Sequence, residues 1–367
     1  REWLKESQND IPEHLDEIIF YLGQAYSLVH KNVSETLLFN GSHLNNNTSF
    51  ENYIKRLGYN FKNEHNEIGG YVLLKNNKFI LMDEFCLASK SIFKIQKKLL
   101  DLININESLS KNLFQINFRS NNENKILVSL IYRKPLIDDL ITHLDELSNK
   151  LNISVNARSK KILLKTEKED FYEIINLNKE NIKVYQSDKT FFQPNKYIYP
   201  KMYEFLINNL FNVDDLLELY CGTGSFTLPL SNKFNKIFAS ENNRESIKML
   251  KKSLLVNNIS NIEIARLNAE EVIEIFSGRK FRRMNNIDIN SYEFSHILVD
   301  PPRSGLDLNV INLVNNFENL IYISCNPDTY IRDIKLLNNF KVAKLALFDQ
   351  FANTKHLEIV SILKKIN

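Results

Sequence analysis

The chain has 367 residues, of which 43% are hydrophobic, and its formal net charge is +3. This length predicts two domains with a sizeable core, and the slight positive charge permits a nucleic-acid partner without requiring one. The three cysteines, Cys86, Cys221 and Cys325, form no CxxC pair, which argues against a disulfide framework, a zinc site or another metal centre, and a four-cysteine iron–sulfur cluster. No segment suits a membrane span or a signal peptide, so we expect a cytoplasmic protein.

The first half of the chain predicts a helical segment followed by an α+β domain. Hydrophobic residues recur at helical spacing over 13–30, whereas 31–52 is polar and is predicted to be a loop. From 53 to 185, short apolar segments flank turn residues. Within this stretch we predict hairpins at 71–82 and 114–132 and helices at 89–103 and 136–150. The expected domains are an N-terminal helical segment, 1–52, packed on the C-terminal domain, and a central α+β domain, 53–185.

The second half, 186–367, predicts alternating strands and helices. The strand candidates are 216–220, 236–240, 261–265, 295–299, 319–324, 341–348 and 357–364. Helical patterns fall between most of them, which predicts an α/β fold with a mostly parallel sheet covered on both faces. The last two strands have only a short connection between them, and this predicts an antiparallel hairpin at the sheet edge.

A glycine loop joins the first of these strands to a helix. The glycines of Gly222-Thr223-Gly224 let the backbone approach a ligand closely, and the helix start offers free N–H groups. Glu241 ends the next strand, where a carboxylate can accept hydrogen bonds from both ribose hydroxyls. The loop has no basic residue for a pyrophosphate, which favours S-adenosylmethionine over NAD or ATP. Taken singly, the features are also compatible with an ordinary turn and a solvated carboxylate.

Two further strands end in acidic or reactive side chains. The diproline at 301–302 ends strand 295–299 and fixes Asp300 at the carboxyl edge of the sheet, where open α/β folds bind ligands. Cys325 follows strand 319–324 and precedes a helix, so we expect the helix N-terminus to lower the pKa of its thiol and make it a nucleophile. The plainer alternatives are a rigid strand exit and a small buried hydrophobic residue.

A thiol that adds to a ring needs a partner that later removes a proton. Glu358 opens the last predicted strand between apolar residues, and such surroundings can raise the pKa of a carboxyl group and make it a base. His356 is a second candidate, and an exposed strand carboxylate is the plainer interpretation of Glu358. We expect the side chains of Cys86 and Cys221 to serve only in packing.

Together these residues resemble the S-adenosylmethionine-dependent RNA uracil-C5 methyltransferases, and within them the bacterial tRNA (uracil-5-)-methyltransferases that make 5-methyluridine in the T loop. The matching motifs are Phe192-Gln193-Pro194-Asn195, 216–224, 299–307, 322–327 and 348–351 with Glu358. The resemblance covers the last two-thirds of the chain well, reaches back through 113–116 and is weak in the first third.

The resemblance implies a Rossmann-like class I methyltransferase sheet, with an α+β RNA-binding domain inserted after the N-terminal helical segment. It implies Cys325 as the nucleophile, Glu358 as the proton acceptor and S-adenosyl-L-methionine as the cofactor. The residues implied to line the cofactor site are Gln193, Tyr220, Ser225, Glu241 and Asp300. In the implied reaction the thiolate adds to uracil C6, C5 takes the methyl group, the carboxylate removes the C5 proton and the thiol leaves by elimination.

The expected partner is the T arm of tRNA, with other RNAs that carry a T-loop-like hairpin as further candidates. The target uridine would be flipped into the pocket. The backbone would be gripped by a helix of the central domain that is rich in lysine, with Lys90, Lys94, Lys97 and Lys98; a solvated lysine face is the alternative. Relatives that act on ribosomal RNA usually add an N-terminal β-barrel and an iron–sulfur site, whose absence here favours tRNA. We expect a monomer and no membrane partner.

Three departures from the family pattern bear on RNA contacts more than on the chemistry. Ser225 stands where the family usually has Asn, 352–358 differs from Pro-Tyr-Thr-His-His-Met-Glu, and 53–58 lacks an acid. Other functions stay open as alternatives. Cytosine-C5 RNA methyltransferases generally need a second cysteine in a Pro-Cys motif, and adenine-N6 methyltransferases use no thiol. The remaining two alternatives are an RNA-binding protein that remodels tRNA without catalysis and an NAD-type oxidoreductase.

Overall fold

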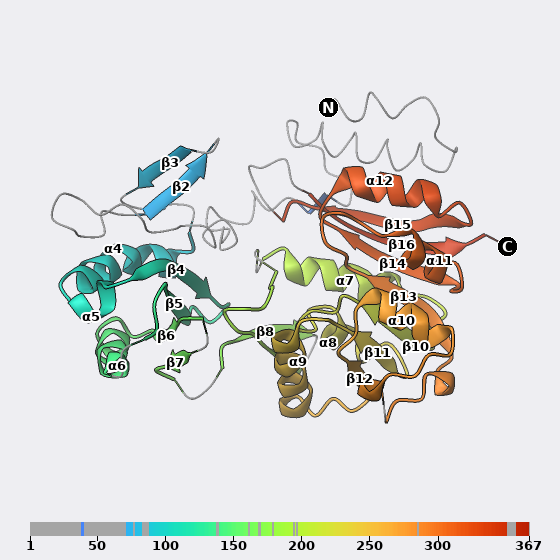
Figure 1. Ribbon diagram of the computed structural model, residues 1–367. Helices are drawn as coiled ribbons and strands as arrows, with labels where there is room; N and C mark the ends of the chain where they lie inside the picture. The colour runs from blue at the N-terminus through green and yellow to red at the C-terminus, as the bar shows by residue number, and fades with distance from the viewer. Residues whose placement is uncertain are drawn as a thin grey trace.

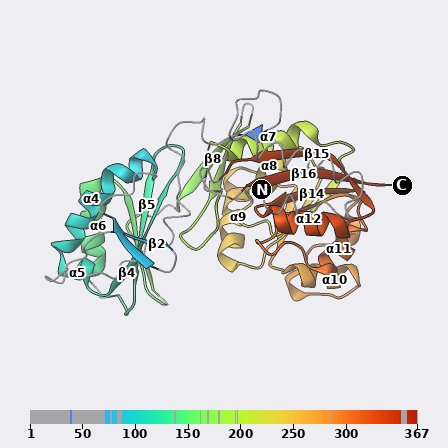
Figure 2. The same cartoon turned by 90° about the horizontal axis from the view of Figure 1, so that it is seen from above.

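The computed structural model describes residues 88–350 and 357–366, except for 137–138, 161, 168–169, 178–179, 194, 196 and 285, and the backbone of 38–39, 71–75 and 78–82. Figures 1 and 2 show a small sheet with its helices beside a larger sheet with helices on both faces. The helix predicted at 13–30, the loop predicted at 31–52 apart from strand β1 (Leu38–Phe39), and the motif at 351–356 lie outside the described residues.

The central part of the chain contains a four-stranded sheet in the order β4-β5-β6-β7. Its strands are β4 (Leu113–Ser120), β5 (Ile126–Tyr132), β6 (Ser154–Arg158) and β7 (Leu163–Lys165). The helices α4 (Lys90–Asn104), α5 (Glu107–Ser110) and α6 (Leu140–Leu151) share a buried core with one face of this sheet. A separate hairpin pairs β2 (Tyr71–Lys75) with β3 (Lys78–Met82). Both predicted hairpins and both predicted helices are confirmed.

A further antiparallel hairpin, β8 (Tyr172–Leu177) and β9 (Glu180–Tyr185), packs on the larger sheet and its helices. Ile175, Ile182 and Val184 belong to the buried cluster that lies on that sheet. The Tyr185 amide donates a hydrogen bond of 2.9 Å to the Ser253 hydroxyl. The division of the chain at 53 and 186 remains a prediction, and this hairpin is one of the points that join the two parts.

The larger sheet has the order β1-β15-β16-β14-β13-β10-β11-β12. Its strands besides β1 are β10 (Asp215–Leu219), β11 (Ile237–Ser240), β12 (Ile262–Ala265), β13 (Phe294–Val299), β14 (Asn319–Ser324), β15 (Phe340–Phe348) and β16 (Glu358–Lys365). The strands from β10 to β14 pair in parallel, and β16 is antiparallel to both of its neighbours. The predicted α/β sheet and the antiparallel hairpin are confirmed. The hairpin is not at the edge of the sheet, because β1 pairs with β15 and forms the edge.

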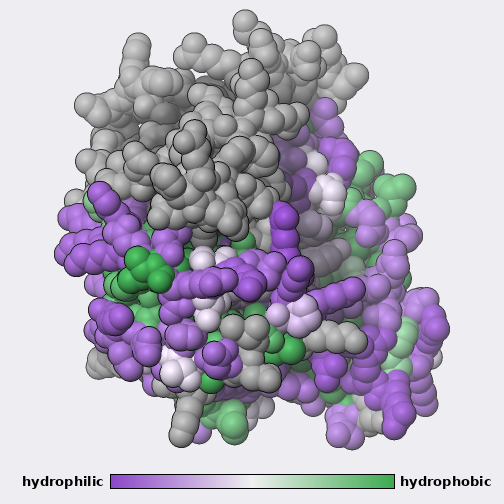
Figure 3. Space-filling view, turned by 60° about the vertical axis from the view of Figure 1, so that its left-hand side comes forward, coloured by the Kyte–Doolittle hydropathy of each residue, from purple (hydrophilic) through white to green (hydrophobic). Residues whose placement is uncertain are grey.

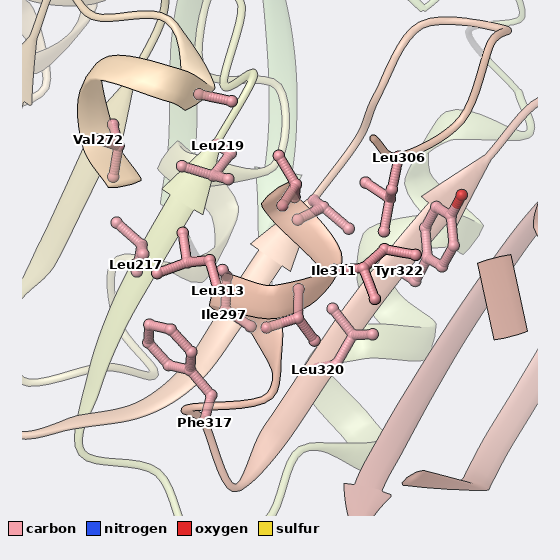
Figure 4. Packing of buried hydrophobic residues seen from close by; sticks show 14 of the residues in the cluster. Leu217, Leu219, Val272, Ile297, Leu306, Ile311, Leu313, Phe317, Leu320 and Tyr322 are labelled. Atoms are coloured by element: carbon pink, nitrogen blue, oxygen red, sulfur yellow. The ribbon is translucent and has the colours of Figure 1, made fainter. Parts of the chain in front are cut away.

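Within the part of the chain that the structure describes, three helices cover each face of the larger sheet. Because side chains alternate along a strand, Leu217 packs on one face with α10 (Ala269–Phe276), α11 (Leu308–Val314) and α12 (Pro327–Leu336). Leu216 packs on the other face with α7 (Tyr199–Asn209), α8 (Thr227–Leu230) and α9 (Arg244–Val256). Figure 4 shows part of the first cluster, where Ile311 and Leu313 meet the strands. The two clusters make the sheet a rigid support for the loops at its edges.

The surface in Figure 3 is mainly hydrophilic where it is coloured, with hydrophobic residues scattered in small groups. Among the described residues, no helix has both the length and the hydrophobicity that a membrane crossing requires.

Candidate active site

Four strand ends meet at one edge of the larger sheet. Leu219 is paired with Val299 across β10 and β13, so Tyr220 and Asp300 follow adjacent parallel strands. Val299 is in turn paired with Tyr322 of β14, which ends just before Cys325. Because the carboxyl ends of parallel strands lie at one edge of a sheet, Tyr220, Asp300 and Cys325 lie together. They lie where the order of the strands reverses, between β10 and β13.

The antiparallel strand β16 brings Glu358 to the same edge. Ser324, the last residue of β14, is paired with Ile359 of β16. One residue closer to the edge of the sheet, Cys325 follows Ser324 and Glu358 precedes Ile359. The thiol and the carboxyl group are therefore neighbours. The sequence analysis identified these two residues separately, and the sheet brings them together.

The glycine loop adopts backbone conformations that favour glycine. Gly224 has φ of +87°, and a Cβ atom there would lie 2.4 Å from a methyl carbon of Leu250. Gly222 has φ of +58°, and its amide donates a hydrogen bond of 3.0 Å to Glu241. The other carboxylate oxygen of Glu241 accepts a 2.6 Å hydrogen bond from the amide of Asn243. The carboxylate is therefore held beside the loop by two backbone amides.

The other two predicted cofactor residues are Gln193 and Ser225. The side-chain oxygen of Gln193 accepts a 2.6 Å hydrogen bond from the side-chain amide of Gln350, just beyond β15. The backbone carbonyl of Ser225 accepts a hydrogen bond from the Tyr199 hydroxyl, and the Ser225 side chain is partly exposed.

The electrostatics around Cys325 differ from the expectation. Burial, together with the Glu358 and Asp300 carboxyl groups, raises the pKa of the Cys325 thiol to about 12, although the charge of Arg303 and a hydrogen bond with it act in the opposite direction. The predicted lowering of the thiol pKa is therefore wrong for the protein without ligands. The helix start visible in the sequence is outweighed by burial and by two acidic neighbours that lie far away along the chain.

The carboxyl groups of the site also hold protons more tightly than usual. Burial raises the pKa of Glu358 well above its ordinary value, with a further contribution from Asp300 and an opposing one from Arg303. Burial raises the pKa of Asp300 to about 7. The direction predicted for the pKa of Glu358 is confirmed, and a carboxyl group of raised basicity therefore lies next to the thiol.

The family model for tRNA (uracil-5-)-methyltransferase matches residues 39–366. The chain belongs to this family. A tRNA/tmRNA (uracil-C(5))-methyltransferase of Campylobacter curvus is 36% identical over 317 residues, which are 86% of this chain and 86% of that protein. The enzyme of the same name from Aliarcobacter butzleri is 39% identical over 310 residues, 83% of each chain.

A solved structure supports the fold assigned to this family member. The Pyrococcus abyssi tRNA (uracil-54, C5)-methyltransferase in complex with S-adenosyl-L-homocysteine superposes with a TM-score of 0.63 at 18% identity. The match covers 95% of this chain and 82% of that chain. It confirms the predicted class of α/β methyltransferase sheet.

Two residues of this tRNA (uracil-5-)-methyltransferase family member were given no role by the sequence analysis. Arg303 follows the diproline and donates to the thiol of Cys325. Glu218 lies inside β10 with only 1% of its surface exposed, and burial raises its pKa to about 8. One of its carboxyl oxygens has no hydrogen-bond partner among the described residues. The sequence offered one signal for each residue. Arg303 lies in a turn that also contains an acid, and Glu218 is an acid within the otherwise apolar predicted strand 216–220.

The remaining candidates are Cys221, Cys86 and His356. Cys221 is 5% exposed and packs in the cluster on the α7 face, as predicted. Cys86 and His356 lie outside the described residues. Within the described part of the chain, His, Cys, Asp and Glu side chains form no group of three that could hold a metal ion.

Proposed function

We propose that the protein methylates C5 of a uridine in the T loop of tRNA, with S-adenosyl-L-methionine as the methyl donor. The observation that carries the proposal is the juxtaposition of Cys325 and Glu358 across β14 and β16, beside the glycine loop. Family membership supports the reaction type and the tRNA substrate. The solved relative that holds S-adenosyl-L-homocysteine supports the choice of cofactor.

The residues around the glycine loop fit such a cofactor. Gly222 and Gly224 leave the loop backbone open to a ligand, and Glu241 is oriented to accept hydrogen bonds from ribose hydroxyls. Glu218 and Asp300 are buried acids with raised pKa, and a cation suits them better than a phosphate does. We assign Gln193, Tyr220 and Ser225 to the same site.

The reaction follows from the chemistry of uracil. The Cys325 thiolate attacks C6, and the electrons of the C5–C6 double bond move to an enolate with charge at C5. S-adenosylmethionine, when bound, supplies the methyl group that C5 accepts. Glu358 then removes the C5 proton, the C5–C6 double bond forms again, and the C6–S bond breaks to release the thiolate. Arg303, which donates to the thiol, would stabilise the thiolate at the first and last steps.

The small sheet and its helices are proposed to bind the RNA. Lys90, Lys94, Lys97 and Lys98 are all exposed on α4 and can neutralise phosphates. A uridine within a T loop must leave its stack before its C5 and C6 atoms reach Cys325. The T arm is the proposed substrate element, as the resemblance of the sequence motifs implies.

The test uses tRNA that carries 5-fluorouridine, mixed with the protein and S-adenosylmethionine and run on a denaturing gel. Fluorine cannot leave as a cation, so the methylated thioether should remain attached to Cys325. We expect a shifted band that Cys325→Ala abolishes and the matched variant Cys221→Ala retains. An isolated T-arm hairpin should form the adduct and an anticodon-arm hairpin should not.

The proton acceptor is tested with unmodified tRNA. Glu358→Gln should accumulate the same kind of adduct, because the methylated intermediate keeps its C5 proton and the thiol cannot leave. If the wild-type protein binds the cofactor and forms no adduct with fluorinated tRNA, the uracil-C5 assignment is wrong and an RNA-binding role without catalysis takes its place.

A further inference from the structure

A buried carboxylate on α12 lies outside the set of residues assigned to the reaction. The side chain of Asp333 is completely buried. One oxygen accepts hydrogen bonds from the Leu306 amide at 2.8 Å and from the Tyr322 hydroxyl at 2.5 Å. The other oxygen accepts two from the guanidinium group of Arg332, at 2.8 and 2.6 Å. Both oxygens of this acid are therefore satisfied by donors from three elements.

These contacts bind the turn after the diproline to the helix. Arg332 also donates to the backbone carbonyls of Ser304 at 2.9 Å and Leu306 at 3.1 Å. Gly305 lies between them with φ of +74°, and a Cβ atom there would lie 2.5 Å from an Asp333 oxygen. The turn is thus in direct contact with the helix, with no room for a side chain at this point.

A second set of contacts joins the same turn to the start of α12. The backbone carbonyl of Arg303 accepts hydrogen bonds from the Asn326 side-chain amide at 3.1 Å and from the Thr329 hydroxyl at 3.3 Å. The turn 303–306 is therefore fixed along two turns of the helix. Cys325 immediately precedes this helix, and the guanidinium group of Arg303 donates to its thiol.

We propose that Asp333 is a positioning residue for the methylation, which fixes the turn 303–306, with Arg303 at its start, against the helix that follows Cys325. The inference rests on the proposed function of Cys325 as the nucleophile. The acid does not touch the reacting atoms. It acts by setting where the Arg303 guanidinium group meets the thiol, and a displacement of about 1 Å in such a group can lower a rate roughly a hundredfold.

The first test is Asp333→Asn, which keeps the size of the side chain and removes its charge. We expect kcat to fall roughly 10- to 100-fold, with KM values for tRNA and S-adenosylmethionine unchanged within about twofold, because the Asp333 side chain is completely buried. The rate of adduct formation with 5-fluorouridine tRNA should fall by the same factor. Asp328→Asn is the matched control, because Asp328 is exposed on the same helix, and it should leave kcat unchanged.

A second readout does not depend on turnover. The rate of Cys325 alkylation by iodoacetamide, corrected with Cys325→Ala, is followed against pH in the protein without ligands. In Asp333→Asn the profile should move to higher pH, since Arg303 no longer meets the thiol in a fixed position. Tyr322→Phe, which removes one donor and keeps the Arg332 ion pair, should show the same shift and loss of kcat to a smaller degree.

The outcomes separate the inference from the function on which it rests. If a folded Asp333→Asn or Tyr322→Phe protein keeps the wild-type kcat and alkylation profile, the positioning role is wrong. The role is also wrong if activity falls only in proportion to the folded fraction measured by circular dichroism. If the wild-type protein itself forms no adduct with fluorinated tRNA, the proposed function fails, and the alkylation profiles then still report on the contact between the turn and the thiol.

Discussion

The side-chain amide of Gln350 donates a hydrogen bond of 2.6 Å to the side-chain oxygen of Gln193. These residues are 157 positions apart in the chain. The contact is supported by Asn195, whose side-chain amide reaches the backbone carbonyl of Gln350 at 3.4 Å. Gln350 is 3% exposed and follows β15, whose end lies beside Glu358. A proposed cofactor residue is therefore fixed to the segment that leads toward the proposed proton acceptor.

Removing this contact should weaken cofactor binding. In Gln350→Ala the Gln193 side chain loses a partner that contributes about 1 kcal/mol, so the Kd for S-adenosylhomocysteine measured by calorimetry should rise about fivefold. The double variant with Gln193→Ala should bind no more weakly than Gln193→Ala alone. Additive effects of the two changes would contradict a shared role. Gln115→Ala, whose contact lies within β4, serves as the control.

The affinity for S-adenosylmethionine should depend on pH through Asp300. Burial raises the pKa of this acid to about 7, so it is largely protonated below that pH and charged above it. The cofactor has a positive sulfonium group and favours the charged form. The Kd should therefore fall as pH rises through about 7 and level off above it, by at most about tenfold per pH unit.

Calorimetry in buffers of different ionisation heat checks this pH dependence, because proton release should accompany binding near neutral pH. Asp300→Asn should flatten the profile, and S-adenosylhomocysteine, which lacks the sulfonium charge, should show a weaker one. A constant Kd for S-adenosylmethionine between about pH 5.5 and pH 8.5 would contradict the role of this carboxyl group.

The two loop glycines should differ in their tolerance of alanine. Gly222→Ala adds a Cβ atom to open space, and the positive φ alone should destabilise the protein by about 1 to 2 kcal/mol. Gly224→Ala adds the same strain and a contact of 2.4 Å with Leu250, so it should destabilise by about 1 to 3 kcal/mol more. Urea unfolding measures both. Equal losses would show that the close approach to α9 is relieved by movement of the Leu250 side chain.

A buried histidine away from the active site should make stability depend on pH. His296 is fully buried on β13, between the rings of Phe211 and Phe234, and burial lowers its pKa to about 4. Above about pH 6.5 the ring is neutral in both states. Between about pH 6.5 and about pH 4 only the unfolded chain binds the proton. The free energy of unfolding therefore decreases by about 3 kcal/mol as the pH is lowered across this window.

Urea unfolding at a series of pH values checks the contribution of this histidine. The difference in unfolding free energy between the wild type and His296→Gln should shrink as pH falls through this window and stay constant above and below it. A difference that does not change with pH would mean that the ring is charged, or equally accessible to protons, in the folded protein.

The sequence was sufficient for the strands of the larger sheet from β10 onward and for two hairpins and two helices of the central part, and it singled out the residues proposed for the site. Alternation and helical spacing predicted the strands and helices because each buries one face or stripe, as with Leu216 and Leu217 on opposite faces of β10. The order of strands could not be predicted in the same way. Glu358 lies next to Cys325 only because β16 is inserted between β14 and β15, and this depends on contacts between residues that are distant in the chain.

The environment of the thiol could not be predicted for a similar reason. The helix that begins after Cys325 is visible as Asn326 and Pro327, and it favours a thiolate. Burial and the approach of Asp300 and Glu358 are properties of the folded chain, and they determine the direction of the pKa shift. The role inferred for Asp333 is likewise invisible in the sequence, where it is one of two acids on an amphipathic helix.

The two backbone amides that hold Glu241 have a consequence for how the protein selects its ligands. A glutamate side chain that is free to rotate would lose about 1 to 2 kcal/mol of rotamer entropy when a ribose binds. In this protein the Glu241 side chain is already ordered, because the amides of Gly222 and Asn243 donate hydrogen bonds to it. The proposed cofactor site is therefore preorganised for a nucleoside with both hydroxyls, if Glu241 has the ribose-binding role that we propose for it. A 2′-deoxy analogue would lose a hydrogen bond without regaining any freedom of the protein, which makes the ribose edge a sharp discriminator for designed inhibitors.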